Sequence, residues 1–406
     1  MRRFGKVSWR PKPRRTAVPC PSAAVVFNVA LVMAVASRSI LVVAHRFSLG
    51  FGGVPESILL LARELATAGV VVDVVCKDGV LEDVGKLDAL PASGRRPGLG
   101  ELLEIDMRAY RSVFVAGSWN PVALLLGIRA RLNGVRLVYS PKGNLAVAEF
   151  KRPRDIKKFP YLLTLEMLLL ALSQRIIFSS KLEREHFILR PLFTRSAAII
   201  PEPFRGPAVS DVSASRGEGA LRFGFLAEIA PRKGLKELVR AFLDWQQQGE
   251  ASAVLHIAGE PRPGSERYYR QTRDIATTAD DPSKIIWRGP LRGVERDRFF
   301  DSIDILVCPT KFESFGLTPL EALWQGKPVI VTANMGVLEF ISDQGSVITL
   351  KDGSESELER GMREAEATHE TLAAAAQRWR SKPQPMGVDI ISRFIVELDL
   401  DDIPQA

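Results

Sequence analysis

The stretch from residue 302 to residue 341 constrains the fold of this chain most strongly. It contains Ile305, Leu306 and Val307, a short apolar run that is typical of a strand buried on both faces of a parallel sheet. A polar loop over residues 310–316 follows, and then a helical pattern and a second apolar run. The stretch therefore predicts a strand, loop, helix, strand unit. Its loop is predicted at the sheet edge where open parallel sheets bind ligands.

The helix after this loop has clear start and stop signals. Thr318 is predicted to be its N-cap and Pro319 its first helical residue, and Glu321 completes a capping box. Gly326 and Pro328 end it, because glycine accepts a left-handed conformation and proline cannot continue a helix. The backbone N–H groups and the dipole at a helix start favour an anion. A phosphate site is therefore predicted there.

Two carboxylates flank the predicted phosphate site. Glu313 precedes the turn and Glu321 lies in the first helical turn. Carboxylates accept hydrogen bonds from hydroxyl groups. Amide donors for phosphate and carboxylate acceptors for hydroxyls together indicate a site for a sugar nucleotide.

The segment Glu313-Ser-Phe-Gly-Leu-Thr-Pro-Leu-Glu321 resembles the E-x7-E motif of retaining, family-four type glycosyltransferases, and Ala322–Val329 resembles the run that follows it in that family. The resemblance implies an α/β chain with the GT-B fold, in which two Rossmann-like parallel-sheet domains face each other across a cleft. It also implies retention of the anomeric configuration with no metal and no cofactor. Helix capping alone would explain an isolated T-x-x-E. The register of Glu313, Phe315 and Gly316 favours the functional interpretation.

The resemblance implies a role for each motif residue. Glu313 would accept hydrogen bonds from the donor sugar and Glu321 from the ribose. The phosphates would bind the backbone amides of Phe315, Gly316, Leu317 and Thr318.

A second phosphate-binding loop is predicted before the helix that starts at residue 235. Relatives carry G-R-x-x-x-x-K-G there, whereas this chain keeps Lys233 and Gly234 but has Ala227 and Glu228 in place of Gly-Arg. A cation stabilises the charge of the leaving group, so Lys233 is the predicted catalytic cation; a solvated helix-start lysine is the alternative. Glu228 would repel a diphosphate unless it points away or pairs with Arg232. Arg232 is the candidate for the missing charge.

The length of 406 residues suits two cores rather than one, and alternating strand and helix patterns predict parallel sheets. A segment rich in proline and glycine between the two halves predicts a linker. The predicted units are a basic and apolar leader outside the core (1–37), an acceptor-side domain (38–200), the linker (201–220), a nucleotide-sugar-binding domain (221–385) and a terminal helix that crosses back (386–406).

The first half offers weaker signals. A glycine-rich turn follows the apolar run 39–44, without the spacing of a dinucleotide fingerprint. Gly52 and Gly53 allow a close backbone approach, and the resemblance places the acceptor near them. Lys142, in Ser-Pro-Lys-Gly after another predicted strand, is the predicted cation on this side. Many relatives have a histidine near this position, and this chain has no histidine there.

The formal net charge of +8 does not indicate nucleic-acid binding, because residues 1–32 hold seven basic and no acidic residues. The apolar run 23–37 has the outline of a signal peptide but is short for a membrane span. A true start at Met33 is a third possibility. Three cysteines without paired spacing fit a reducing compartment and argue against a disulfide framework or a zinc site.

Nucleotide sugars are cytosolic metabolites, so a cytoplasmic location is predicted, with peripheral contact at the inner face of the membrane as an open alternative. Residues 156–173 are apolar with a basic flank, and a core helix is preferred there over a bilayer-interface helix.

The predicted function is transfer of a hexose from a nucleotide diphosphate sugar to a glycan, lipid-linked or small-molecule acceptor, in polysaccharide or glycolipid biosynthesis. Two alternatives remain. One is a non-catalytic homologue that binds sugar nucleotides, since the usual arginine is lost. The other is a nucleotide-sugar epimerase of the same fold, which should need catalytic carboxylates and histidines that the sequence does not reveal. The donor sugar, the base and the acceptor are not encoded in any recognisable motif.

Overall fold

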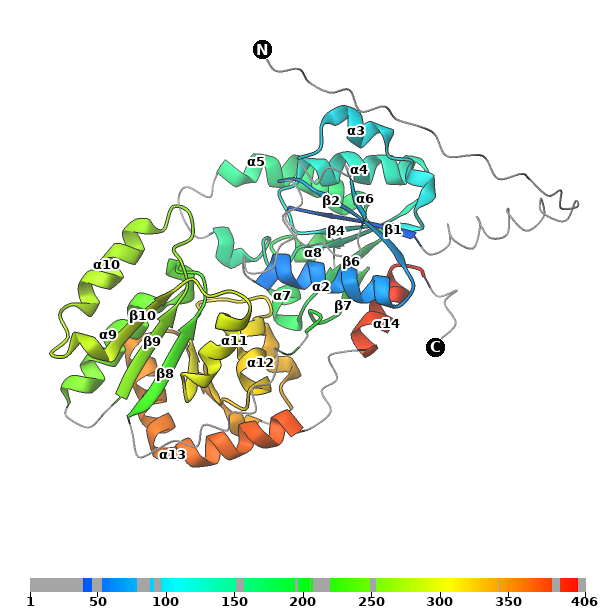
Figure 1. Ribbon diagram of the computed structural model, residues 1–406. Helices are drawn as coiled ribbons and strands as arrows, with labels where there is room; N and C mark the ends of the chain where they lie inside the picture. The colour runs from blue at the N-terminus through cyan, green and yellow to red at the C-terminus, as the bar shows by residue number, and fades with distance from the viewer. Residues whose placement is uncertain are drawn as a thin grey trace, which may run out of the picture.

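The computed structural model describes residues 39–45, 53–78, 88–90, 96–150, 157–193, 196–204, 206, 220–248, 253–342, 344–381 and 388–400. Figure 1 shows two α/β domains, one built from the blue to green half of the chain and the other from the green to orange half. The predicted leader lies outside the described residues. Of the predicted linker, only residues 201–204, 206 and 220 are described.

The first domain contains a parallel sheet of seven described strands in the order β3-β2-β1-β4-β5-β6-β7. The central strands β1 and β4 are buried along their whole length, as continuous apolar runs in parallel sheets are. The short edge strands β3 and β7 were not predicted, because three residues carry no periodic pattern. The strands are β1 (Ser39–Ala44), β2 (Val71–Cys76), β3 (Asp88–Leu90), β4 (Ser112–Ala116), β5 (Arg136–Ser140), β6 (Arg175–Phe178) and β7 (Ala197–Ile199). The helices are α2 (Gly53–Thr67), α3 (Leu99–Glu104), α4 (Pro121–Leu132), α5 (Phe159–Tyr161), α6 (Met167–Leu172), α7 (Lys181–Glu185) and α8 (Arg190–Phe193).

The second domain contains a parallel sheet of six described strands in the order β10-β9-β8-β11-β12-β13. The strands are β8 (Leu221–Leu226), β9 (Ala253–Ala258), β10 (Ile285–Gly289), β11 (Ile305–Cys308), β12 (Val329–Thr332) and β13 (Val347–Leu350). The helices are α9 (Leu235–Gln247), α10 (Glu266–Ala276), α11 (Val294–Asp301), α12 (Leu317–Trp324) and α13 (Glu355–Ser381). The prediction of two parallel-sheet domains is confirmed.

The last helix, α14 (Val388–Glu397), packs against the first domain. Its Phe394 ring packs edge-on against Phe114 of β4, with 5.8 Å between the ring centroids. Glu397 accepts hydrogen bonds from Arg175 of β6, at 2.5 Å and 3.0 Å. Figure 1 shows α14 beside the first sheet, away from the rest of the second domain.

The prediction of a core helix over residues 156–173 is wrong for one of its faces. Leu162 and Leu169 are buried, but Leu163 is 58% exposed and Leu168 is 45% exposed. The segment runs through α5, a π-helical turn (Leu162–Glu166) and α6 on the outside of the first domain. An all-round apolar helix usually indicates full burial, so the sequence pattern alone was misleading here.

One apolar cluster contains buried residues from both domains. Ile58 of α2 and Phe394 of α14 belong to it together with Leu320 of α12. The start of α2 also meets the start of α12, because a Cβ atom on Gly53 would lie 3.9 Å from Leu317 Cδ1. Gly53, at the end of the predicted glycine-rich turn, is thus a neighbour of the motif helix of the second domain.

Candidate functional site

The motif loop after β11 is held in place by backbone hydrogen bonds to the segment that follows β12. The amide of Glu313 donates to the carbonyl of Asn334 at 2.9 Å, and the amide of Gly336 donates to the carbonyl of Glu313 at 3.0 Å. Further along the loop, the amide of Val337 donates to the carbonyl of Phe315 at 2.9 Å. These bonds fix the backbone from which the Glu313 side chain projects.

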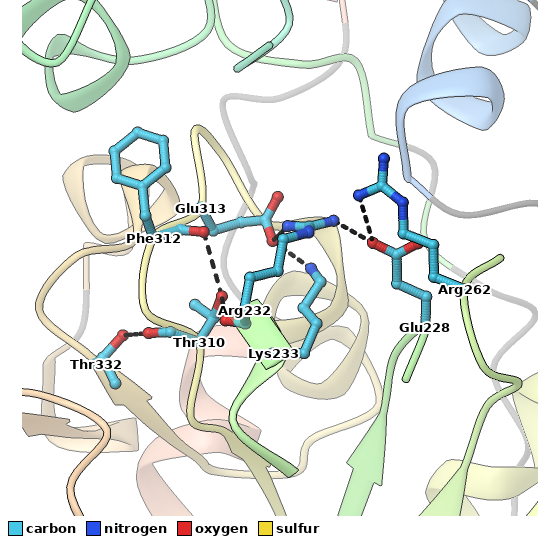
Figure 2. Close-up of polar contacts among 8 residues, drawn as sticks. All are labelled: Glu228, Arg232, Lys233, Arg262, Thr310, Phe312, Glu313 and Thr332. Carbon is cyan, nitrogen blue, oxygen red and sulfur yellow. Dashed lines mark hydrogen bonds and ion pairs between the residues drawn. The ribbon is translucent and has the colours of Figure 1, made fainter. Parts of the chain in front are cut away.

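The turn η5 (Pro231–Lys233) is locked against the same loop. Gly234 ends this turn with φ 72, and a Cβ atom there would overlap the carbonyl oxygen of Pro309. Only glycine allows this approach without strain. The hydroxyl of Thr310 donates to the carbonyl of Arg232 at 3.2 Å (Figure 2). The Lys233 side chain is therefore held at the end of β11, next to the motif.

Four charged side chains form an alternating network at this point, and we call it the Glu313 cluster: Glu228, Arg232, Lys233 and Glu313. Figure 2 shows the Lys233 ammonium and the Arg232 guanidinium converging on one carboxylate oxygen of Glu313, with 3.4 Å from Arg232 Nη1 to that oxygen. The other end of the Arg232 guanidinium binds Glu228. Pairing with Arg232 was one of the two arrangements expected of Glu228, and the structure confirms it.

The Glu313 carboxylate is a strong acid in this setting. Burial on its own would raise the pKa of Glu313, but Lys233 and Arg232 outweigh burial and lower it from 4.5 to about 2. The side chain is only 19% exposed. Glu313 is therefore ionised at neutral pH and is a weak base, which suits a hydrogen-bond acceptor better than a proton acceptor.

The depressed pKa of Glu313 predicts a pH-dependent contribution to stability. A group with a lowered folded-state pKa stabilises the fold fully above about pH 4.5, and this contribution is lost as the pH falls toward 2. We expect the difference in free energy of unfolding between the native protein and Glu313→Gln to shrink by about 1.4 kcal/mol between about pH 7 and pH 3.5. Urea titrations at both pH values measure it. A difference that stays constant would contradict the ion pairing described here.

The predicted capping of the motif helix is wrong. Helix α12 begins at Leu317, with Gly316 at its N-cap and no side-chain cap, so Thr318 and Pro319 lie inside its first turn. Gly316 has φ 97, a conformation that glycine reaches without strain, and the chain enters the helix before Thr318. Glu321 does not reach back to the cap either. Gly326 is left-handed at the end of the helix with φ 71, as predicted.

Glu321 instead binds an arginine that the sequence analysis did not single out. Arg296 Nη2 of α11 lies 2.9 Å from Glu321 Oε1 and 2.7 Å from Oε2. The Glu321 side chain is 7% exposed. Nothing in a single sequence marks Arg296, because a Val-Glu-Arg-Asp helix start is common on solvated surfaces.

The remaining predicted motif residues are divided between the core and the domain boundary. Phe315 is 2% exposed and its ring packs against Phe340 with 5.5 Å between the centroids, so its side chain belongs to the core. Leu317 lies against Gly53 across the domain boundary. Gly52 lies outside the described residues.

Lys142 was predicted to present its charge to a substrate, but the structure buries it in an ion pair. It is 4% exposed, has φ 53, and its ammonium donates to both oxygens of Glu202, at 2.8 Å and 2.7 Å. Ser57 of α2 binds the same carboxylate. Lys142 therefore joins the loop after β5 to the end of the first domain. A signal for Glu202 was present in Pro201-Glu-Pro203, where a lone acid stands between two prolines at the domain boundary.

Further polar contacts join the two domains beside the motif. Glu339 accepts hydrogen bonds from the amides of Lys181 and Leu182 at the start of α7, at 2.9 Å and 2.8 Å. The hydroxyl of Ser180 donates to the carbonyl of Ser314 inside the motif, at 2.6 Å. The motif loop is thus in direct contact with the first domain.

Gly336 supports this contact and yields a stability prediction. A Cβ atom at Gly336 would overlap the Ser314 carbonyl oxygen and the Ser180 hydroxyl. We expect Gly336→Ala to destabilise the protein by about 1–3 kcal/mol, because overpacking forces the backbone to shift. Urea unfolding measures it. Gly100→Ala on α3 is the control, because a Cβ atom there meets nothing within 4 Å; equal effects of both substitutions would contradict the packing argument.

A buried acid in the first domain also escaped the sequence analysis. The Tyr139 hydroxyl donates to Glu166 Oε1 at 2.5 Å and contacts the Ser118 hydroxyl at 2.6 Å. Glu166 Oε2 accepts the amide of Trp119 at 3.0 Å. Burial raises the pKa of both Tyr139 and Glu166. This network joins the loop that leaves β4 to β5 and to the π-helical turn.

Two further findings bear on the site and its surroundings. Across the described ranges, no three His, Cys, Asp or Glu side chains are grouped so that they could hold a metal ion. Within the same ranges, no helix combines the length and the apolar character that are needed to cross a bilayer.

Comparison with known proteins agrees with this architecture. Anabaena HepE, solved in complex with UDP and glucose, superposes with a TM-score of 0.66 at 16% identity, over 89% of this chain and 98% of that one. Sucrose-phosphate synthase from Thermosynechococcus elongatus superposes with a TM-score of 0.65 at 16% identity, over 90% and 97% of the two chains. WaaG, a glycosyltransferase involved in lipopolysaccharide biosynthesis, superposes with a TM-score of 0.62 at 16% identity, over 90% and 100%.

Sequence relatives match a shorter region. An uncharacterized glycosyltransferase from Methanocaldococcus jannaschii is 27% identical over 120 residues, which is 30% of this chain and 29% of that protein. D-inositol 3-phosphate glycosyltransferase from Stackebrandtia nassauensis is 27% identical over 143 residues, or 34% and 32% of the two chains. The alignments thus span about a third of these relatives.

The two parallel-sheet domains share the GT-B fold of these solved glycosyltransferases. Residues 212–382, which include the whole second sheet, match the profile of the family described as "Glycosyl transferases group 1".

Proposed function

We propose that this protein transfers a sugar from a nucleotide diphosphate sugar to an acceptor hydroxyl with retention of the anomeric configuration. The observation that carries the proposal is the convergence of Lys233 and Arg232 on Glu313 beside the start of α12. A donor needs cations for its diphosphate and acceptors for its sugar hydroxyls, and this cluster supplies both kinds of group.

The diphosphate would bind between Lys233, Arg232 and the first amides of α12. The first N–H groups of a helix have no acceptor inside it and attract anions. Charge develops on the leaving diphosphate as the glycosidic bond breaks, and preformed cations stabilise it. In this arrangement Arg232 supplies the positive charge that relatives place at the position of Glu228, and Glu228 holds it there.

Glu313 would accept hydrogen bonds from the sugar hydroxyls rather than remove a proton. Its pKa of about 2 makes it a poor base at neutral pH. We therefore assign it to donor binding at the reacting sugar and name no protein base. The departing phosphate oxygen would take the proton of the acceptor hydroxyl, as the resemblance implies.

The acceptor would approach from the first domain, near Gly53 and the Ser180 end of α7, because both adjoin the motif. Several named relatives support a carbohydrate acceptor of some kind, since they include a sucrose-phosphate synthase and a lipopolysaccharide glycosyltransferase. We propose a glycan, a glycolipid or a phosphorylated sugar as the acceptor class. The proposed location is the cytoplasm, where nucleotide sugars are made.

Incubation of the purified protein with UDP-, GDP- and ADP-linked hexoses tests the proposal. Slow release of the nucleoside diphosphate from one donor, accelerated by a carbohydrate acceptor, is the expected result. Product NMR then reports the anomeric configuration. Binding without turnover would instead support a non-catalytic homologue, and a changed sugar epimer would support an epimerase.

A further inference from the structure

Arg296 contacts the second motif carboxylate in an unusual way. One nitrogen, Nη2, spans both oxygens of Glu321, at 2.9 Å to Oε1 and 2.7 Å to Oε2. The Arg296 side chain is 21% exposed and rises from the first turn of α11. A two-pronged arginine to carboxylate pair would use two nitrogens. Here a single nitrogen holds the carboxylate from one side.

The Glu321 carboxylate consequently keeps unused acceptor capacity. Oε2 is buried, and the Arg296 nitrogen approaches it outside hydrogen-bond geometry, so it accepts no hydrogen bond within the described part of the chain. An ionised carboxylate offers about four acceptor positions. Buried acceptors without a donor are rare in native proteins, which points to hydroxyl donors that arrive with a ligand.

A third charge faces this pair from the other domain. Burial, more than any other cause, raises the pKa of Glu56 in the first turn of α2, while Arg296 lowers it and Glu321 raises it. Without Arg296, two carboxylates would share this corner with an anionic nucleotide. Arg296 is the cation that offsets them.

We propose that Arg296 is a positioning residue of the donor site, which holds Glu321 for the two ribose hydroxyls of the nucleotide and offsets its negative charge. The inference rests on the proposed function, because it takes a nucleotide as the ligand. It assigns to Arg296 a part in distinguishing ribonucleotides from deoxyribonucleotides.

A merely structural ion pair predicts a different result. Loss of an arginine with only a structural role would weaken the binding of all ligands alike, or would lower only the melting temperature of the protein. Loss of a positioning arginine changes the ratio of two affinities. The 2′-deoxynucleotide lacks one of the two hydroxyls that would donate to Glu321, so its affinity depends less on the orientation of that carboxylate.

Calorimetric titration of UDP, GDP and ADP, each beside its 2′-deoxy counterpart, measures this ratio. We expect the native protein to bind at least one ribonucleotide about tenfold more tightly than its deoxy form, as one hydrogen bond to a charged group allows. In Arg296→Leu the ratio should fall to about twofold or less. Glu321→Gln should lower it similarly. Arg298→Leu, an exposed arginine on the same helix, should leave it unchanged.

Each other outcome decides a separate point. If none of the three nucleotides binds the native protein, the proposed function fails and this inference fails with it. If a nucleotide binds but Arg296→Leu keeps the native ratio, or the native protein shows no ribose preference, only the inference fails. Circular dichroism checks folding. Should Arg296→Leu not fold, Arg296→Met replaces it, because methionine keeps an unbranched stem but has neither the charge nor a hydrogen-bond donor, and an unchanged ratio in that variant overturns the inference.

Discussion

Replacement of Lys233 by methionine is expected to lower kcat for sugar transfer by about 10²–10³-fold. Methionine keeps the unbranched, flexible stem and removes the ammonium that binds Glu313 and would face the diphosphate. The charge on the leaving group is greatest in the transition state, so the loss should fall mainly on kcat. The affinity for the nucleoside diphosphate should fall as well. Steady-state kinetics with the best donor of the panel provide the measurement.

Lys311→Met is the matched control for this substitution. Lys311 lies two residues before Glu313, but its side chain is 57% exposed and pairs with Glu237. It should retain activity within about threefold, as surface ion pairs contribute little. Lys233→Arg should recover part of the rate, because the positive charge is kept. Near-native turnover by Lys233→Met would contradict the catalytic role proposed for Lys233.

Replacement of Glu313 by glutamine is expected to lower transfer by about 10²-fold. The amide keeps the size of the side chain and one acceptor oxygen, but it no longer holds the Lys233 and Arg232 cations. The same change removes a negative charge from an anion site. The affinity for the free nucleoside diphosphate should therefore stay the same or rise, in contrast to the expected result for Lys233→Met.

These opposite binding effects separate two roles that loss of activity alone would not. Calorimetry with the nucleoside diphosphate, run beside the kinetics, supplies the comparison. Glu295→Gln, an exposed acid on α11, serves as the control and should match the native protein in both assays. If Glu313→Gln lost nucleotide affinity and transfer in parallel, Glu313 would be supporting the loop rather than contacting the sugar.

Much of the architecture could be predicted from the sequence, because the buried strands of parallel sheets have a pattern that is visible in a few consecutive residues. Buried strands such as Ser39–Ala44 and Val329–Thr332 are nearly unbroken apolar runs, and the structure gives the first of them the predicted bounds. The stop signal after α12 was predicted equally well, since Gly326 adopts the left-handed conformation. Each of these features depends on residues that are adjacent in the chain.

The parts that failed depend on contacts between distant residues. Glu321 fits a capping pattern, but Arg296 from another helix engages it, and Gly316 starts the helix earlier than Thr318 would. Lys142 follows a strand end as a substrate cation should, yet Glu202, sixty positions away, holds its ammonium. Local patterns give a side chain its candidate partners and cannot choose among them. The pairing of Glu228 with Arg232 could be predicted, because the two residues are only four positions apart in the chain.

The return of α14 to the first domain has a mechanical consequence. The chain passes from one domain to the other after Phe204 and passes back before Val388, and Glu397 and Phe394 anchor the returning end to β6 and β4. The two domains are therefore linked by the chain twice, and the contacts of Phe394 and Glu397 hold the second link against the first sheet. This double linkage limits how far Glu313 can move away from Gly53.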